Sequence, residues 1–286
     1  MEFFGLTLTA EAVLALATIY LLQFVGFTVL AFIARRGDAL KWDTPLLKSA
    51  GVNWAFIGAN SLMTPSAFAL IGLVDEAFRQ SGIPRLSEEF WGFAPAIVPA
   101  LVALVVADFV DYWSHRLRHV SVLWPMHAVH HSDTQMHYLS WYRAHIVELV
   151  VIHGSYALLA TWMGASPAAV TGVILFRGFH QQYVHMNVDW GHGPFKWLLV
   201  SPRFHRWHHA NHPDAWDKNF SGIFSIWDRL FGTAYCPGPC KVPLGFPGNP
   251  GEHFIKLMSY PFVEWGRMLA RLGNRVRAGK AQREPR

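Results

Sequence analysis

Residues 108–132 of the chain are DFVDYWSHRLRHVSVLWPMHAVHHS, and this stretch of 25 residues contains five histidines. His115 and His119 lie four residues apart, a spacing that places both rings on one face of a helix. His127 and His130 lie three residues apart, and His131 adds a neighbouring direction. The stretch therefore predicts helices that present imidazoles toward a common point.

The same His-x-x-His-His spacing returns at residues 201–209, SPRFHRWHH, with His205, His208 and His209. Eight imidazoles beside apolar helices are costly to bury without partners, and coordination to a metal removes that cost. A structural zinc site uses four ligands and a catalytic zinc site about three. Eight imidazoles exceed either requirement, so the spacing predicts two adjacent metal ions.

The type of ligand alone does not identify the metal, because imidazole binds zinc, copper, iron and nickel. The position of the histidines favours iron. A cluster at the inner ends of hydrophobic helices meets an acyl chain from the bilayer and a reductant from the cytosol. Oxidation of an unactivated C–H bond requires a redox metal and O2, so we expect a di-iron centre.

Apolar segments surround the histidines. The chain of 286 residues is 52% hydrophobic and 15% charged, whereas soluble domains have about 25% charged residues. Ala12–Ala34 contains 23 uncharged residues, enough to cross about 30 Å of hydrocarbon. Residues 49–74 and 90–107 form two more such stretches. These segments predict three membrane crossings.

A fourth apolar stretch, residues 149–176, is interrupted by Gly-Ala-Ser-Pro at 164–167. Proline disfavours helix at the residue before it, so the stretch predicts two helices, about 146–163 and 167–184. This hairpin either crosses the membrane fully or enters and returns on the same side. Arg177 keeps the second arrangement open, since a full crossing would place this arginine within the membrane.

The charges around the first segment predict its direction. No basic residues precede the apolar run, only Glu2 and Glu11, so we expect no cleaved signal peptide. Arg35, Arg36 and Lys41 follow it and predict a cytoplasmic end there. Three crossings then place every histidine group on the cytoplasmic side. We expect a multi-pass protein of a bacterial inner membrane.

The predicted fold class is all-α, an integral membrane helical bundle with a cytoplasmic histidine-rich di-iron cap. We divide the chain into N-terminal transmembrane helices with a connecting loop (1–89), a catalytic domain (90–235), and a C-terminal Pro/Gly-rich segment with a basic amphipathic tail (236–286). Only Cys236 and Cys240 are present, so no disulfide framework is expected.

The net charge of +5 comes from the C-terminal tail. From Arg267 onward the chain has seven basic residues and one acidic residue, and we therefore expect no nucleic-acid partner. Met268, Leu269, Leu272 and Val276 alternate with the arginines at helical spacing. The pattern is typical of a helix lying on anionic headgroups, although a solvated, disordered tail fits the composition equally well.

Three motifs together resemble the fatty acid hydroxylase/sterol desaturase superfamily. They are DxxDYWxHRxxH at 108–119, WxxHxxHHS at 124–132 and SPRxHRxHH at 201–209. The resemblance continues through DKNFSG at 217–222 and IWDRLFGT at 226–233, and it covers about residues 100–235. It implies an integral-membrane, histidine-ligated di-iron oxygenase that acts on lipids or sterols with O2. Electrons would come from an external donor, either a redox protein or a reduced pterin.

The resemblance also extends the set of candidate ligands. RAHIVE at 143–148 and HMN at 185–187 match further family motifs and add His145 and His185. The ten candidate metal ligands are His115, His119, His127, His130, His131, His145, His185, His205, His208 and His209.

Residues around the ligands are expected to support them. Asp111 precedes His115 by one helical turn, where its carboxylate would accept a proton from the ring nitrogen that does not bind metal. The second-shell candidates are Asp108, Asp111, Glu148 and Asn187. The candidates for the substrate pocket are Trp113, Trp141, Tyr142, His153 and His180. We expect no catalytic residues beyond the metal ligands.

The chain departs from the family pattern near the expected substrate pocket and in the cap. Residues 139–142 are LSWY where the family often has small residues, and Phe220 stands where tyrosine is common. Bulkier groups at 139–142 would narrow or reshape a pocket. The substrate of a relative therefore cannot be carried over to this chain.

The predicted reaction is hydroxylation or desaturation of an aliphatic carbon in a lipid, a fatty acyl or alkyl chain, or a sterol. A carotenoid or isoprenoid hydroxylase is the alternative enzyme. A non-catalytic metal-binding or transport protein is a further alternative, but a transporter would carry its ligands at mid-membrane depth in a repeated fold.

Overall fold

The computed structural model describes residues 2–3, 6–7, 10–35, 43–95 and 97–281. Several charged residues used above lie outside this part of the chain: Arg36, Lys41, Arg283, Glu284 and Arg286. The side chains of Val276, Arg277 and Lys280 are likewise not described. The only strands among the described residues are β1 (Glu2–Phe3) and β2 (Leu6–Thr7), which pair antiparallel. The fold is otherwise helical, as predicted.

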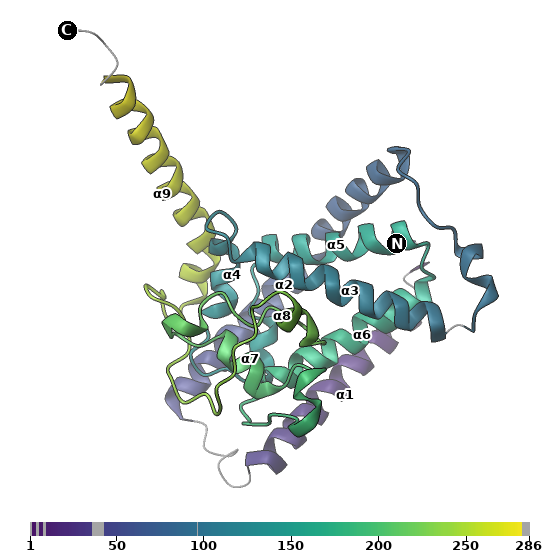
Figure 1. Cartoon of the computed structure of the whole chain (residues 1–286), viewed down its shortest axis with the longest axis horizontal. Helices are drawn as coiled ribbons and strands as arrows, with labels where there is room; N and C mark the ends of the chain where they lie inside the picture. Colours follow the sequence, from purple (N-terminus) through teal and green to yellow (C-terminus); the bar gives the residue numbers. More distant parts are fainter. Residues whose placement is uncertain (1, 4–5, 8–9, 36–42, 96, 282–286) are drawn as a thin grey trace.

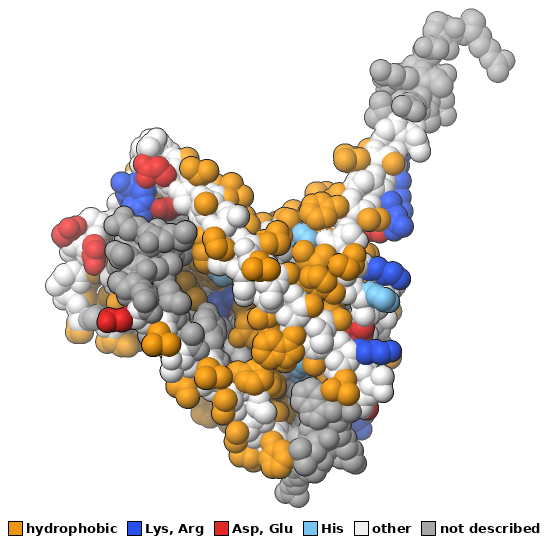
Figure 2. All heavy atoms as spheres, turned by 180° about the vertical axis from the view of Figure 1, so that it is seen from behind, with side chains coloured by type: hydrophobic (Ala, Val, Ile, Leu, Met, Phe, Trp, Pro, Cys, Tyr) orange, Lys and Arg blue, Asp and Glu red, His pale blue; other side chains and the backbone are white. Residues whose placement is uncertain are grey.

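Three described helices are long and apolar enough to cross a membrane, namely α2 (Thr44–Gln80), α3 (Ile97–Arg118) and α5 (Ile146–Met163). The predicted first crossing lies within α1 (Ala10–Arg35). Within α1, Leu21–Ala34 forms an apolar stretch that is shorter than the three helices above. α2 begins where the Asp43 carboxylate accepts a hydrogen bond from the Leu46 amide, a typical N-cap. Apolar side chains cover much of the surface of this bundle (Figure 2).

The predicted hairpin forms with the expected bounds, α5 followed by α6 (Pro167–Val184). Gly164 ends α5 at φ 57°, and a Cβ there would lie 2.6 Å from the Leu86 carbonyl oxygen, so only glycine fits. Ser166 caps α6 by accepting a hydrogen bond from the Ala169 amide. α5 packs against α2 and α3, and α6 packs against α3.

The third apolar segment differs from the prediction. Residues 88–93 form a short 3₁₀ helix, η2 (Glu88–Phe93), and α3 begins only at Ile97. Pro95 separates the two, because proline disfavours helix at the residue before it. α3 then continues beyond the uncharged segment to Arg118, as the helical spacing of Asp111, His115 and His119 predicted, and Asp108 and Asp111 are buried and hydrogen bonded. As a result, His115 lies on the apolar helix itself.

Short helices form a cap at one end of the bundle (Figure 1). In chain order they are α4 (Trp124–His131), η3 (Tyr138–Tyr142), η4 (Gly193–Trp197), α7 (Pro202–His208), η5 (Pro213–Ala215) and α8 (Ile226–Leu230). The C-terminal α9 (Phe254–Ala281) packs against α4 and α2 and then projects from the molecule (Figure 1). The tail is therefore helical over its described residues.

Candidate metal centre

Nine of the ten candidate ligands lie in two groups inside the cap. His115, His119, His127, His131 and His208 form group 1, and His130, His185, His205 and His209 form group 2. Within each group, one nitrogen per ring lies within 4.8 Å of all the others, a separation that a single metal ion can bridge. The rings come from the end of α3, from α4, from the C-terminus of α6 and from α7.

The His-x-x-His-His motifs divide their rings between the two groups. In α4, His127 and His131 are four residues apart and share group 1, whereas His130 belongs to group 2. In α7 and its C-cap the assignment is reversed, since His205 and His209 share group 2 and His208 belongs to group 1. Each motif thus contributes to both groups, which fixes the two groups side by side.

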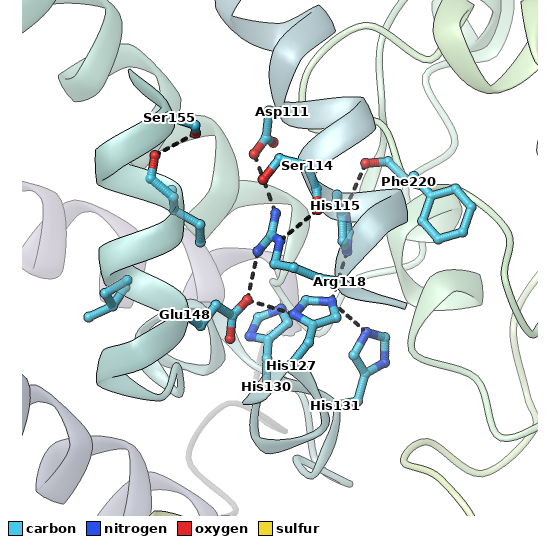
Figure 3. Close-up of polar contacts among 12 residues, drawn as sticks. Asp111, Ser114, His115, Arg118, His127, His130, His131, Glu148, Ser155 and Phe220 are labelled. Atoms are coloured by element: carbon cyan, nitrogen blue, oxygen red, sulfur yellow. Dashed lines mark hydrogen bonds and ion pairs between the residues drawn. The ribbon is translucent and has the colours of Figure 1, made fainter. Parts of the chain in front are cut away.

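The ring nitrogens within each group face one another. In group 1, His127 Nε2 lies 3.0 Å from His115 Nε2 and 3.2 Å from His131 Nε2. Figure 3 shows these three rings turned toward a common point. In group 2, His185 Nε2 lies 3.1 Å from His130 Nε2 and 3.0 Å from His205 Nε2.

Backbone carbonyls fix the tautomer of four of these rings. The Nδ1 atoms of His115 and His208 lie 2.7 Å from the carbonyl oxygens of Phe220 and Lys218. His185 and His130 make the same contact to Gln181 and Arg143, at 2.6 and 3.3 Å. A carbonyl oxygen only accepts, so each Nδ1 carries the proton and each Nε2 presents a lone pair.

This arrangement fits a bound cation. Facing lone pairs on Nε2 atoms about 3 Å apart repel one another, and a shared metal ion converts that repulsion into coordination. The Nε2 atoms of His119 and His208 are buried and have no hydrogen-bond partner among the described residues. Both belong to group 1 and would gain a partner from the same ion.

Burial also keeps the rings in the form that binds metal. Desolvation, reinforced by the neighbouring imidazoles, lowers the pKa of His127, His131, His205 and His209 well below its ordinary value. A neutral imidazole has the free lone pair that coordination requires. The site is therefore prepared for metal without the cost of removing protons.

Of the four predicted second-shell residues, Glu148 contacts a candidate ligand. Its Oε1 lies 2.6 Å from His127 Nδ1 and accepts a hydrogen bond of 2.6 Å from Arg118 (Figure 3). Asp217, which was not predicted, lies 3.2 Å from His119 Nδ1. The signal for Asp217 was its place in the DKNFSG motif, since nothing in local spacing relates it to His119.

The prediction for Asp111 was wrong. Its carboxylate does not contact His115, whose Nδ1 faces the Phe220 carbonyl instead. Asp111 pairs with Arg177 at 2.5 Å and with Arg118 at 3.4 Å. Two buried guanidinium groups that approach from α6 and α3 thus attract this carboxylate away from the neutral ring.

The other two second-shell candidates support the backbone. Asp108 accepts hydrogen bonds from the amides of Ile223 and Phe224 at 2.8 Å each, and this holds the loop that carries Phe220. Asn187 accepts a hydrogen bond from Arg206 and contacts no ring of either group in the hydrogen bonds described. Both residues stabilise the cap by hydrogen bonds, and they affect the candidate ligands only through it.

A chain of buried charges explains how the charged side chain of Arg177 is accommodated within the apolar helix α6. It runs from Arg177 through Asp111 and Arg118 to Glu148, with alternating sign at each step, and ends at the neutral ring of His127. Figure 3 shows Asp111, Arg118, Glu148 and His127 in this order. All four charged side chains are buried. The arginine within the hairpin therefore faces the protein interior and is neutralised there.

His145 lies outside both groups. Its Nδ1 accepts a hydrogen bond from the Val147 amide and caps the N-terminus of α5. Its Nε2 lies 3.1 Å from the Met258 carbonyl oxygen. The proton is therefore on Nε2, opposite to the four rings fixed by carbonyls. Both ring nitrogens are used, so the structure does not bring this predicted ligand to the metal centre.

The predicted pocket residues are scattered. Trp113 lines a cavity of about 360 Å³ between α3 and α5, with Phe109, Leu117, Arg118 and Val151 also on its walls. Trp141 lies beside the rings of His130 and His185, with centroids 6.4 and 6.1 Å away.

The remaining three pocket candidates are not on that cavity. Tyr142 packs against the cluster around Phe27 and Leu139. His153 Nδ1 lies 2.8 Å from the Leu149 carbonyl oxygen, and its ring meets Phe68. His180 lies against Phe176 and Tyr183.

Comparison with known proteins agrees with this geometry. The chain is 28% identical to ornithine lipid hydroxylase OlsE of Rhizobium tropici over 73% of its own length and 66% of the relative. It is 33% identical to the alkylglycerol monooxygenase of Homo sapiens over 46% of its own length and 29% of that relative. It is 24% identical to methylsterol monooxygenase 1-3 of Arabidopsis thaliana over 62% of its own length and 58% of that protein. The chain thus spans at most about two-thirds of these relatives. No solved structure matches it.

The family model described as fatty acid hydroxylase matches residues 100–233. These residues contain all nine histidines of the two groups, together with Glu148 and Asp217. Residues 100–233 of the chain therefore resemble the fatty acid hydroxylase family.

Proposed function

We propose that this protein is an O2-dependent di-iron monooxygenase that hydroxylates an aliphatic carbon of a membrane lipid. The observation that carries the proposal is the pair of adjacent, buried imidazole groups at the end of apolar helices. One oxygen atom of O2 would enter a C–H bond to give an alcohol. The other would leave as water with two electrons and two protons from an external donor.

Each imidazole group would hold one iron ion. Iron, when bound, supplies the redox chemistry that O2 activation requires and that zinc cannot provide. The protein supplies the geometry: carbonyls orient four rings through Nδ1, and Glu148 orients His127. Arg118 holds Glu148 in turn and keeps its Oε1 directed at that ring.

The substrate class follows from the surroundings of the site and from the relatives. The cavity beside Trp113 is walled mainly by apolar side chains of α3 and α5, two of the membrane-capable helices. The relatives are named as an ornithine lipid hydroxylase, alkylglycerol monooxygenases and a methylsterol monooxygenase. Those names favour hydroxylation of a lipid over desaturation.

The electron donor would be a redox protein or a reduced pterin that reaches the cap from the cytoplasm. This orientation rests on Arg35, Arg36 and Lys41 after the first apolar segment. A bacterial inner membrane is the compartment in which the bilayer lipid and a cytoplasmic reductant are both available.

Lipid mass spectrometry tests the proposal. Lipid extracts of cells that express the protein are compared with those of cells expressing His130→Ala at equal abundance. We expect a lipid class that gains one oxygen atom only with the unaltered protein. A loss of two hydrogen atoms instead would indicate desaturation, and identical lipid profiles under iron-replete, aerobic growth would contradict the proposal.

A further inference from the structure

α9 has two chemically different sides along its exposed length. Phe262, Trp265, Leu269 and Leu272 follow one another at intervals of three and four residues and form one apolar stripe. We call these four residues the apolar stripe of α9. Leu269 is 70% exposed, Phe262 57% and Leu272 56%, so the described part of the chain leaves most of these three side chains uncovered.

The opposite side of α9 is basic. Arg267, Arg271 and Arg275 also follow at intervals of four residues, and all three side chains are exposed. One of them, Arg267, pairs with Glu264 within the helix. The described residues contain no acidic partner for Arg271 or Arg275 in an ion pair. We call Arg267, Arg271 and Arg275 the basic stripe.

The placement of α9 relative to the bundle is informative. Figure 1 shows α9 leaving the cap and running across the direction of α3 and α5 rather than alongside them. In Figure 2 the apolar atoms of α9 continue the apolar surface of the bundle, and its basic atoms line the other edge of the helix. A helix that lies across the membrane-capable helices at the level of the cap runs along the plane of the bilayer surface.

The first half of α9 is fixed to the metal-binding cap. Leu257 is fully buried in a cluster with Val52, Phe56 and Val129. The Trp265 indole donates a hydrogen bond of 2.7 Å to the Val122 carbonyl, in the segment between His119 and His127. The helix therefore does not swing independently of the cap, and its orientation relative to the bundle is defined.

We propose that α9 is an interfacial helix that docks on an anionic phospholipid surface on the histidine side of the membrane. Its apolar stripe lies in the boundary between headgroups and acyl chains, and its basic stripe contacts lipid phosphates. Charge complementarity identifies the occupant, because the apolar stripe alone would also suit a second copy of the chain. Arg271 and Arg275, on the opposite side of the helix and without an acidic partner among the described residues, match anionic headgroups.

Spin-label accessibility tests this placement. The full-length protein with Cys236→Ser and Cys240→Ser receives one nitroxide, at Leu269→Cys or at Arg271→Cys, and is placed in nanodiscs of phosphatidylcholine with or without phosphatidylglycerol. Leu73→Cys, on the exposed face of α2, provides the reference in lipid, and Lys241→Cys provides the reference in water. With phosphatidylglycerol, the label at 269 should resemble the lipid reference in its collisions with O2 and with a water-soluble nickel chelate. The label at 271 should be more accessible to nickel.

A charge-reversed variant separates lipid docking from mere apolar contact. Arg271→Glu with Arg275→Glu should shift the label at 269 toward the aqueous reference in phosphatidylglycerol discs, whereas Arg85→Glu on the exposed loop after α2 should not. Label accessibility at 269 equal to that at Lys241 in both lipids would overturn the proposal. Dipolar broadening between labels at 269 would also overturn it, since a second copy would then cover the apolar stripe. Neither readout depends on turnover, so the result is separable from the proposed activity.

Discussion

Glu148 Oε1 lies 2.6 Å from His127 Nδ1 and 2.6 Å from an Arg118 nitrogen, deep in the protein. A carboxylate in this position fixes the tautomer and rotation of the ring and raises its basicity toward a metal. The contact joins α5, a membrane-capable helix, to α4, which carries three candidate ligands. The geometry of the site is thereby tied to the packing of the bundle.

The first prediction concerns this contact. Glu148→Ala should weaken metal binding by about 10- to 100-fold, the usual effect of removing a second-shell partner. Competition with a chelator, followed by metal analysis of the purified protein, measures the change. Glu76→Ala, at an exposed site on α2, is the matched control and should retain full affinity. Unchanged affinity in Glu148→Ala would show that the carboxylate does not position His127.

The second prediction concerns Arg177. Arg177→Met leaves Asp111 with one guanidinium instead of two, and breaking a buried ion pair costs about 3–5 kcal/mol. We expect a marked decrease in the thermal unfolding temperature in detergent. Adding Asp111→Asn removes the carboxylate that has lost its nearer guanidinium and should restore much of the loss. If the single and double variants unfold at the same temperature, the two side chains are not coupled.

The third prediction separates His145 from the two groups. His145→Asn keeps an N-cap for α5, because asparagine is among the best capping residues. We expect this variant to retain its full metal content, while His208→Ala loses metal. Metal loss in His145→Asn without a fall in stability would restore His145 to the ligand set.

The fourth prediction concerns the cavity between α3 and α5. Val151→Trp would fill part of its volume of about 360 Å³, and we expect a higher KM for the lipid substrate with unchanged metal content. Leu70→Trp, on the exposed surface of α2, provides the control. Equal KM values in the two variants would indicate that the substrate chain does not use this cavity.

Sequence predicted the local features of the fold well. The Gly-Ala-Ser-Pro break set the end of α5 and the start of α6, because a left-handed glycine at 164 and a proline at the first position of α6 act locally. The third apolar segment was predicted to begin at residue 90, whereas α3 begins at Ile97. Pro95 disfavours helix at the residue before it, and the burial of Asp108 and Asp111 depends on partners more than 60 residues away.

The candidate site was predictable in composition but not in arrangement. Helical spacing paired His127 with His130 and gave His131 a neighbouring direction, whereas the structure assigns His127 and His131 to group 1. Assignment of His130 to group 2 depends on where α6 and α7 lie, which spacing cannot give. Asp111 and His145 were misplaced for the same reason. Their actual partners, Arg177 and the Met258 carbonyl, are distant in the sequence and are brought near by helix packing.

Metal analysis of the purified, full-length protein tests the central claim most directly. After iron-supplemented expression, the account predicts about two iron ions per chain, one for each group of imidazoles. His130→Ala and His208→Ala should each lower that content, because they remove ligands from different groups. Stoichiometric zinc that persists under iron-supplemented expression, or a content of one ion per chain that neither variant changes, would contradict the account.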